Sequence, residues 1–414
     1  MSGPGYSYYA SSGTLRPHFY QSLVDRGWRR SGTLLYRPNQ RNACCPHYAL
    51  RLDSAAFKPS RDQRQAINRF NRHVLGDTYA KEAARRYPRS REESRKRDTT
   101  FDLVERAHEA ENHRVPQPPK PAHDFTVSLE PDTFTEEKYA VFESYQRAVH
   151  GEGPDRISRH GFKRFLCSSP LGQETDQDAE GRERRLGSFH QCYRLDGRLV
   201  AVGVLDLLPH AVSAVYFMYH ESVHSHNFGK LGALHEIALA TEGGYRWWYS
   251  GFYIHGCPKM RYKIDYQPQY VLDPESLEWD QLTGEALAVF DRQPYVSLSR
   301  ERRKRRFGED ALPEEEWSDS QSWDGDDAFD DKDSVLLHSN MPGIPSLEQM
   351  KQVDLDHIAI HVPDRGYHET GELTVWPYET ITDFDTLKAK VAELVAAIGP
   401  DLIPDICLRI PDKS

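Results

Sequence analysis

The segment between residues 187 and 256 constrains the fold most strongly, because its pattern changes from strands to a helix and back to a strand. Three runs rich in β-branched and aromatic residues come first, GSFHQCYRL, RLVAVGVLDLL and VSAVYFMYH. A helix follows in KLGALHEIALATE and stops at Gly243-Gly244, after which RWWYSGFYIHG is again typical of a strand. An antiparallel meander, a helix and a further strand predict an α+β layer architecture.

The chain of 414 residues is long enough for two or three domains, and local signals suggest their limits. Residues 1–58 are typical of short strands and turns, and Ser60 with Gln63 predicts a capping box at the start of a helix. Thr135 predicts the N-cap of a second helix, which Gly151 would follow. We therefore expect a small basic N-terminal module (1–77), a charged and proline-rich linker (78–123), a main core (124–300), a basic-then-acidic disordered linker (301–335) and a C-terminal segment packing on the core (336–414).

The net charge of −10 is unevenly distributed. Residues 1–120 contain 23 Lys plus Arg against 12 Asp plus Glu, or +11, so the remainder carries −21. A basic region of this kind is typical of proteins that bind a nucleic acid. No apolar stretch approaches the length of a membrane span, the N-terminus lacks signal-peptide features, and six scattered cysteines suggest no disulfide framework, so we expect a cytoplasmic or nuclear protein with no membrane partner.

The motif DRGWRRSG (25–32) concentrates three arginines, a tryptophan and two glycines in eight residues. Guanidinium groups bind phosphates bidentately, and glycines let backbone N–H groups approach an anion. The alternative is a basic turn anchored by a buried Trp28. If the motif binds a nucleic acid, the basic residues expected to contact it are Arg26, Arg29, Arg30, Arg37, Arg61, Arg64 and Lys230.

Further motifs follow in a fixed order: LLYRP (34–38), Cys44-Cys45, FKPSRDQRQ (57–65), SPL (169–171), AVYFMYH (214–220), FGKLGALHEIAL (228–239) and FYIHGCPKMRYK (252–263). With DRGWRRSG, this order resembles the arginyl-tRNA–protein transferases of eukaryotes and, more distantly, the bacterial leucyl-tRNA–protein transferases. The resemblance covers about residues 4–75 and 125–280. It implies transfer of arginine from Arg-tRNA to proteins with N-terminal Asp, Glu or oxidised Cys, which marks them for ubiquitin-dependent degradation.

The order of strands and helices in the main core is also that of a GNAT-like acyltransferase, in which the loop entering the central helix binds the donor. Transfer to an α-amine needs no covalent intermediate, because an amine with a pKa near 8 is already partly neutral, and no cofactor is required. Two alternatives remain: an acetyl-CoA-dependent N-acetyltransferase, and a non-catalytic binder of tRNA or acidic N-termini.

The candidate catalytic residues are His235 and Glu236 on the helix and Tyr253 and His255 on the following strand. A carboxylate must hold the guanidinium of a donor arginine, and Asp206 and Glu236 are the candidates. For an acidic acceptor the site should be cationic. Lys259, Arg261 and Lys263 alternate in CPKMRYK, and in an extended segment they would project from one face.

The cysteines depart from the family pattern. Relatives carry a CxxC pair near the N-terminus that, with the downstream pair, is expected to bind zinc or an iron–sulfur cluster. In this chain Pro4 and Ser7 stand where those cysteines would be. Cys44 and Cys45 alone lack the four thiolates typical of such a site, which leaves either a metal-independent protein or a structural, redox-sensitive pair.

Overall fold

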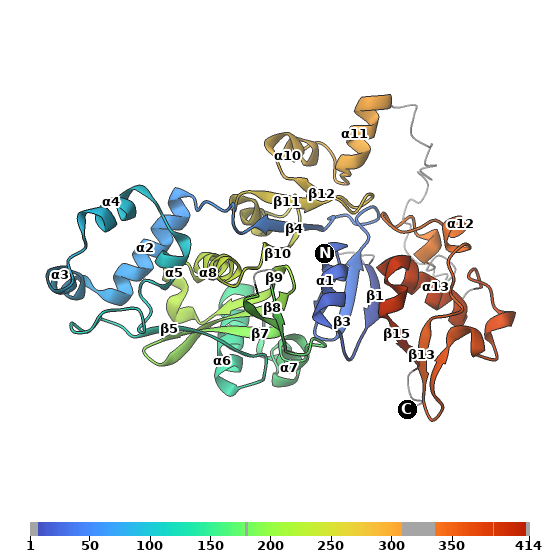
Figure 1. The fold of residues 1–414 in the computed structure, drawn as a ribbon, viewed down its shortest axis with the longest axis horizontal. Coiled ribbons are helices and arrows are strands. Elements are labelled where there is room, and N and C mark those ends of the chain that lie inside the picture. Colours follow the sequence, from blue (N-terminus) through green and yellow to red (C-terminus); the bar gives the residue numbers. More distant parts are fainter. Residues whose placement is uncertain (1–6, 179–180, 309–335, 384, 411–414) are drawn as a thin grey trace.

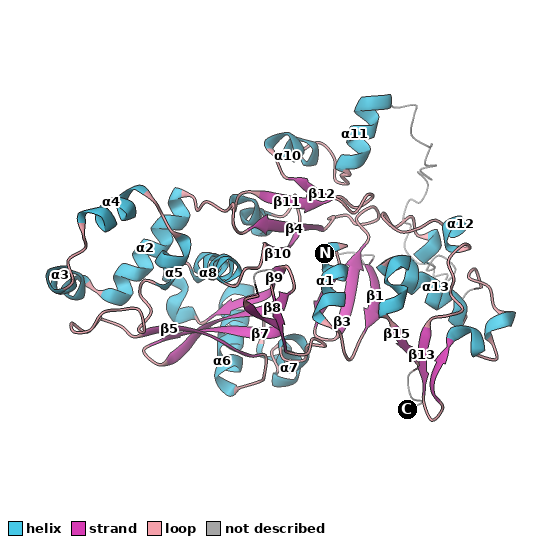
Figure 2. Cartoon of the chain, in the orientation of Figure 1, coloured by secondary structure: helices cyan, strands magenta, loops and turns pink. Residues whose placement is uncertain are grey.

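The computed structural model describes residues 7–178, 181–308, 336–383 and 385–410. Helices and sheets are mixed along an elongated molecule, which confirms the α+β class (Figures 1 and 2). Within these residues, none of the helices combines the length and apolar character that crossing a membrane requires. The acidic tract predicted to be disordered lies almost entirely outside the described residues.

A nine-stranded sheet forms the centre of the molecule, with the order β12-β11-β4-β10-β9-β8-β7-β5 and β6 paired with β7. The predicted meander is confirmed as antiparallel β7–β8–β9, and β10 returns parallel to β9. The strands are β4 (Tyr48–Asp53), β5 (Phe125–Pro131), β6 (Glu174–Gln177), β7 (Glu183–Leu195), β8 (Arg198–Leu208), β9 (Ala211–Tyr219), β10 (Trp247–Tyr253), β11 (Gln269–Leu272) and β12 (Trp279–Gln281).

Helices cover both faces of this sheet (Figure 1). On one face α8 (Phe228–Glu242) packs with α2 (Arg61–Leu75) around a core that contains Phe70, Phe125 and Leu234. On the other face α6 (Glu136–Tyr145) and α7 (Arg159–Leu166) bury their own apolar cluster. The predicted capping box of Ser60 and Gln63 and the Thr135 N-cap are confirmed, so local sequence signals place both helices correctly.

The N-terminal module forms a three-stranded sheet of β1 (Ser7–Ser11), β3 (Leu34–Pro38) and β2 (Arg29–Ser31). The expectation of strands and turns alone is wrong, because Pro17 stands at the first position of a helix, α1 (Pro17–Asp25). The module is not separate from the core, since β4 leaves it to pair between β10 and β11.

Residues 78–123, interpreted as a linker, carry α3 (Asp77–Arg86), α4 (Arg91–Thr99) and α5 (Leu103–His108). Their start signals were present, because Ser90 and Glu93 form a capping box and Asp102 caps α5. The basic cluster at 301–307 is likewise helical rather than disordered, within α11. The prediction of a linker relied on the high charge of these residues and overlooked the helix N-caps that the same sequence contains.

The remaining elements follow β10 along the chain, and apolar residues of the C-terminal segment (336–414) pack in one cluster with residues of the N-terminal module and of the central sheet. These elements are α9 (Pro258–Arg261), α10 (Gly284–Phe290), α11 (Leu298–Phe307), α12 (Leu347–Met350), α13 (Leu387–Ile398), β13 (Ala359–Val362), β14 (Gly366–Glu369) and β15 (Cys407–Arg409). Short 3₁₀ or π turns span Gln146–His150, Pro154–Arg156, Glu221–His226, Tyr262–Asp265, Leu336–His338, Thr370–Glu372, Trp376–Tyr378 and Pro400–Asp405.

A buried ion pair joins the N-terminal module to the central sheet. Arg30 Nε lies 2.8 Å and Nη2 2.6 Å from the two carboxylate oxygens of Asp206 on β8, and Nη2 also lies 3.0 Å from Ser188 Oγ. Both side chains have no exposed surface. A buried pair of this kind is costly to break from one side, because the remaining charge is left without a partner.

We expect Arg30→Met and Asp206→Leu each to lower the free energy of unfolding by about 3–5 kcal/mol. The double variant Arg30→Met/Asp206→Leu should lose much less than the sum, because it leaves no unpaired charge. Urea unfolding of the four proteins measures this coupling. Additive losses would show that the pair does not act as a unit.

Candidate active site

Helix α8 crosses from the end of β9 to the start of β10 and lies tightly against the sheet. Gly232 allows this approach, because a Cβ atom there would come within 2.2 Å of the Phe217 ring. The helix begins after Asn227, which has a φ of 58°. Every residue from Leu231 to Ala238 is buried, so the two polar side chains of this stretch, His235 and Glu236, point into the protein.

Glu236 is the buried carboxylate on this helix. Its side chain accepts a hydrogen bond of 2.9 Å from the Trp248 indole on β10. Burial raises the pKa of Glu236 to about 7, against the opposing effects of Trp248 and the nearby Lys263 ammonium. A Cβ atom at residue 203 would lie 3.4 Å from Glu236 Oε1, so Gly203 keeps the space beside the carboxylate open.

Lys263 lies in the interior beside this carboxylate, which corrects the prediction of a basic strand. Pro258 starts the short helix α9 and a 3₁₀ turn follows, so the alternation in CPKMRYK does not put three cations on one extended face. Lys259 and Arg261 are exposed, whereas Lys263 is buried and donates a 2.7 Å hydrogen bond to the Phe252 carbonyl. Burial, with Arg29 nearby, lowers the pKa of Lys263 to about 8.

Arg29 is the second buried cation of this region. Its Nη1 donates to the carbonyls of Val24 and Trp28, at 3.1 and 2.6 Å, and the guanidinium lies over the rings of Tyr249 and Phe252. Its Nε and Nη2 atoms are buried without a hydrogen-bond partner. Arg29 and Lys263 thus form a buried cationic pair. No carboxylate of the described residues accepts a hydrogen bond from either side chain.

Hydrogen bonds connect Tyr253, the last residue of β10, with His255 in the turn that follows. The Tyr253 hydroxyl lies 2.6 Å from His255 Nδ1, and His255 Nε2 lies 2.8 Å from Asp291 Oδ1. Burial raises the pKa of Tyr253. His235 does not join either group, because it packs against the rings of His108, Phe125 and Tyr193 and burial lowers its pKa to about 3.

The arginines expected to contact a nucleic acid fall into two groups. Arg29, Arg30 and Arg37 are buried, and Arg26 and Arg37 donate to main-chain carbonyls near the end of α13, so none of the four offers a free surface group. Asp206 cannot hold a donor guanidinium because Arg30 already occupies both its oxygens. Sequence reasoning missed the contacts of Arg26 and Arg37 because their partner carbonyls lie more than 300 residues away.

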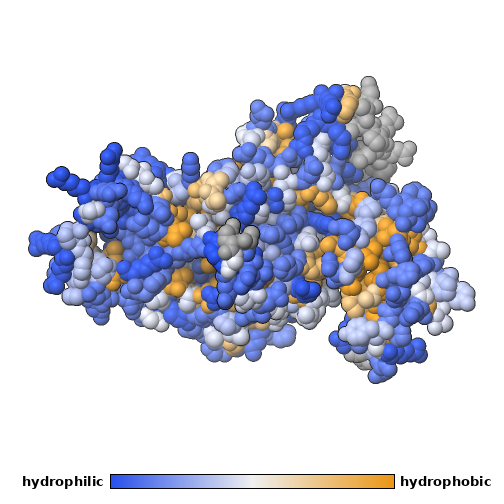
Figure 3. All heavy atoms as spheres, viewed as in Figure 1, coloured by the Kyte–Doolittle hydropathy of each residue, from blue (hydrophilic) through white to orange (hydrophobic). Residues whose placement is uncertain are grey.

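Many exposed cations lie instead on and beside α2 to α4. Arg61 and Arg64 are exposed, and Lys230 at the start of α8 pairs with Asp62. The surface over these helices, at the left of Figure 3, is predominantly hydrophilic. The further exposed basic residues there are Lys58, Arg69, Arg72, Lys81, Arg85, Arg86, Arg91, Arg95 and Lys96.

Cys44 and Cys45 do not fit the metal or cluster implied by the family resemblance. Both are exposed, and their sulfur atoms lie 3.6 Å apart. In the described part of the chain they meet no third cysteine, histidine or carboxylate close enough to share one ion. Ser7 begins β1 and carries no thiol, and Pro4 lies outside the described residues.

Comparisons with known proteins agree in two regions. The family model described as the N terminus of arginine-tRNA-protein transferase matches residues 4–65, and the model of its C terminus matches residues 137–273. A Saccharomyces cerevisiae arginyl-tRNA–protein transferase is 30% identical over 61% of this chain and 48% of its own length. The chain thus spans about half the length of that relative.

Two further relatives are covered more fully. A Drosophila melanogaster arginyl-tRNA–protein transferase is 28% identical over 68% of this chain and 78% of its own length. A Pseudomonas fluorescens aspartate/glutamate leucyltransferase is 31% identical over 61% of this chain and 78% of its own length. Among solved structures, L-PGS from Bacillus licheniformis matches 50% of this chain and 47% of its own at 9% identity, with a TM-score of 0.28 that is too low to support an argument.

The buried Lys263 should make stability depend on pH. Its folded pKa of about 8 lies below the ordinary value of 10.5, so above pH 8 the folded state loses the proton before the unfolded state does. Stability contributed by this group therefore rises with pH. Between pH 7.5 and 10, wild type should gain about 2 kcal/mol in free energy of unfolding relative to Lys263→Met.

Urea unfolding at several pH values measures this difference. Arg29, Glu236 and His47 are the charged or titratable groups whose charges couple to Lys263, and all three remain in the variant. A pH-independent difference would show that Lys263 is solvated.

Proposed function

The chain belongs to the arginine-tRNA-protein transferase family, and from that premise we propose that it is an aminoacyltransferase that moves arginine from Arg-tRNA to the α-amino group of proteins beginning with Asp or Glu. The two matched regions form one folded unit, because β4 of the first pairs with β10 and β11 of the second. The observation that carries the acceptor preference is the buried pair Arg29 and Lys263, because no carboxylate of the described residues accepts a hydrogen bond from either side chain.

We propose that the first acidic side chain of the acceptor supplies this missing anion. Arg29 has two buried nitrogen atoms without partners, and a carboxylate accepts from such a fork bidentately. Exposed Lys259 and Arg261 would attract the acidic N-terminus towards the same segment. The proposal keeps Lys263 as an acceptor-binding residue, at the base of a site rather than on a strand face.

The donor arginine is proposed to bind at Glu236. The carboxylate is buried next to Gly203 and accepts a hydrogen bond from the Trp248 indole. Its charge, like that of Arg29, acts on Lys263. A guanidinium bound to Glu236 and a carboxylate bound to Arg29 would hold the ester and the amine side by side. Positioning of this kind supplies much of the rate in an aminolysis.

In the transfer, the neutral α-amine nitrogen forms a bond to the ester carbonyl carbon, the bond to the ribose oxygen of tRNA breaks, and the amine proton passes to that oxygen. Tyr253 and His255 are the proposed groups for moving the proton, because His255 bridges the Tyr253 hydroxyl and Asp291. The exposed basic helices α2 to α4, with Arg61, Arg64 and Lys230, are the proposed tRNA surface.

Three finer points belong to the same proposal. The β7–β9 meander followed by α8 and parallel β10 supports a GNAT-like arrangement. Cytoplasmic or nuclear action and marking of the acceptor for ubiquitin-dependent degradation are part of what we propose. The leucyltransferase relative makes leucine the second candidate donor, and a carboxylate at residue 236 favours arginine over it, because leucine has no charge to pair.

The direct test is transfer of radiolabelled amino acid from charged tRNA to peptides beginning with Asp, Glu or Ala. We expect arginine, not leucine, to reach Asp and Glu but not Ala. Glu236→Gln should lower kcat/KM with Arg-tRNA by about 100-fold, because it removes the buried charge pair between residue 236 and the guanidinium of the donor arginine. The exposed Glu285→Gln is the matched control and should keep full activity. Equal transfer of leucine would reject the donor assignment.

A second prediction concerns the acceptor. Arg29→Met and Lys263→Met should each raise the KM for an Asp peptide by about 10-fold or more, while the KM for Arg-tRNA stays unchanged. The exposed Arg305→Ala should alter neither value. Steady-state kinetics with each substrate varied in turn separates the two sites. A rise in the KM for Arg-tRNA alone would return Arg29 to the tRNA-binding group.

A further inference from the structure

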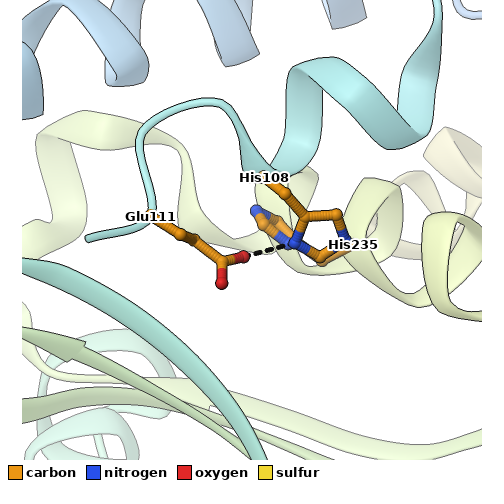
Figure 4. A group of neighbouring side chains, drawn as sticks. All are labelled: His108, Glu111 and His235. Atoms are coloured by element: carbon orange, nitrogen blue, oxygen red, sulfur yellow. Dashed lines mark hydrogen bonds and ion pairs between the residues drawn. The ribbon is translucent and has the colours of Figure 1, made fainter. Parts of the chain in front are cut away.

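Three metal-ligating side chains meet away from the proposed active site. His108 is the last residue of α5, Glu111 lies in the turn that follows, and His235 projects from the middle of α8. One ligand atom from each residue lies within 4.8 Å of the other two. Figure 4 shows the three side chains converging between the two helices.

His235 provides an independent sign that a ligand is missing. The residue is 2% exposed, and its Nδ1 atom is buried without any hydrogen-bond partner. The Tyr193 ring lies against the imidazole, but the Tyr193 hydroxyl donates to Gln191. A buried ring nitrogen without a partner costs free energy, so a group that binds this nitrogen would stabilise the fold.

We propose that His108, Glu111 and His235 bind one divalent ion of the zinc class, which fastens α5 to α8. Two imidazole nitrogens and one carboxylate oxygen are a donor set that zinc accepts, with a fourth position left for water. Ligand atoms around a tetrahedral zinc ion lie about 3.3–3.5 Å apart, so small side-chain rotations would complete the site.

The surroundings are also those of a metal site. His108 Nε2 lies 3.0 Å from Glu242 Oε2, so a carboxylate stands behind this ligand and fixes the ring while Nδ1 faces the ion. His113 Nδ1 lies 3.5 Å from the second oxygen of Glu111. Ligating histidines commonly have such outer carboxylate partners, which set the tautomer and the ring orientation.

A metal-free explanation accounts for only part of the cluster. His108 can stand between Glu111 and Glu242 as an ion-paired imidazolium, which would satisfy those three groups. The ring nitrogen of His235 then stays buried and unpaired. An ion accounts for all three side chains at once. It is also separate from Cys44 and Cys45, which lie in the N-terminal module.

The test uses the full chain, stripped with chelator and then titrated with Zn²⁺ or Co²⁺ alone. We expect one ion per chain and a rise in Tm of at least ~2 °C at saturating Zn²⁺. The Co²⁺ spectrum should show tetrahedral bands without a thiolate charge-transfer band. Each of Glu111→Gln and His235→Phe should lose the Zn²⁺-dependent rise in Tm, whatever its effect on the metal-free Tm.

The double variant Cys44→Ser/Cys45→Ser is the matched control and should bind Zn²⁺ like wild type. The proposal is overturned if wild type binds no ion, if Glu111→Gln and His235→Phe bind Zn²⁺ normally, or if the cysteine variant alone loses binding. These readouts do not involve aminoacyl transfer, so they stand or fall apart from the proposed function.

Discussion

The ion pair between Arg30 and Asp206 is the contact on which the arrangement of the N-terminal module depends. Both groups are removed from water. The Arg30 guanidinium donates hydrogen bonds to both carboxylate oxygens of Asp206 and to the Ser188 hydroxyl. Such a pair adds little net stability over an apolar contact, but it penalises any packing that separates the partners. It therefore fixes β2 against β8, and with it the position of the adjacent Arg29.

Residues in and near the DRGWRRSG motif (25–32) also bind the C-terminal segment. Trp28 Nε1 and Arg37 both donate to the Ala397 carbonyl, at 3.1 and 2.7 Å, and Arg26 donates to the Ile398 carbonyl. The last carbonyls of a helix lack partners within it and attract positive charge, so these side chains complete the end of α13. Two arginines and a tryptophan that resemble a phosphate site by composition bind the carbonyls of a helix terminus instead.

Local structure followed from the sequence, and burial did not. The capping box at Ser60 and the meander depend on residues close in the chain, and the structure confirms them. Whether Arg30 is exposed depends on Asp206, 176 residues away, and no periodicity carries that information. The alternation of Lys259 to Lys263 predicted a strand because it ignored Pro258, which favours the first turn of a helix. Glu236 was identified from its place on α8, but only tertiary contacts show its partner Trp248.

Adjacent residues of α8 link the two proposed sites. Successive side chains of an α-helix point about 100° apart, so His235 faces α5 while Glu236 faces Trp248 on β10. A rotation of α8 about its axis would move both side chains together. An ion held by His108, Glu111 and His235 would oppose that rotation from one side, and the Phe217 ring pressed against Gly232 opposes it from the sheet.

The orientation of Glu236 relative to Lys263 and Arg29 is thus set by contacts outside the reacting groups. The buried carboxylate and the two buried cations must keep their spacing if they are to hold a cationic donor beside an anionic acceptor, because charge interactions in a buried site change steeply with distance.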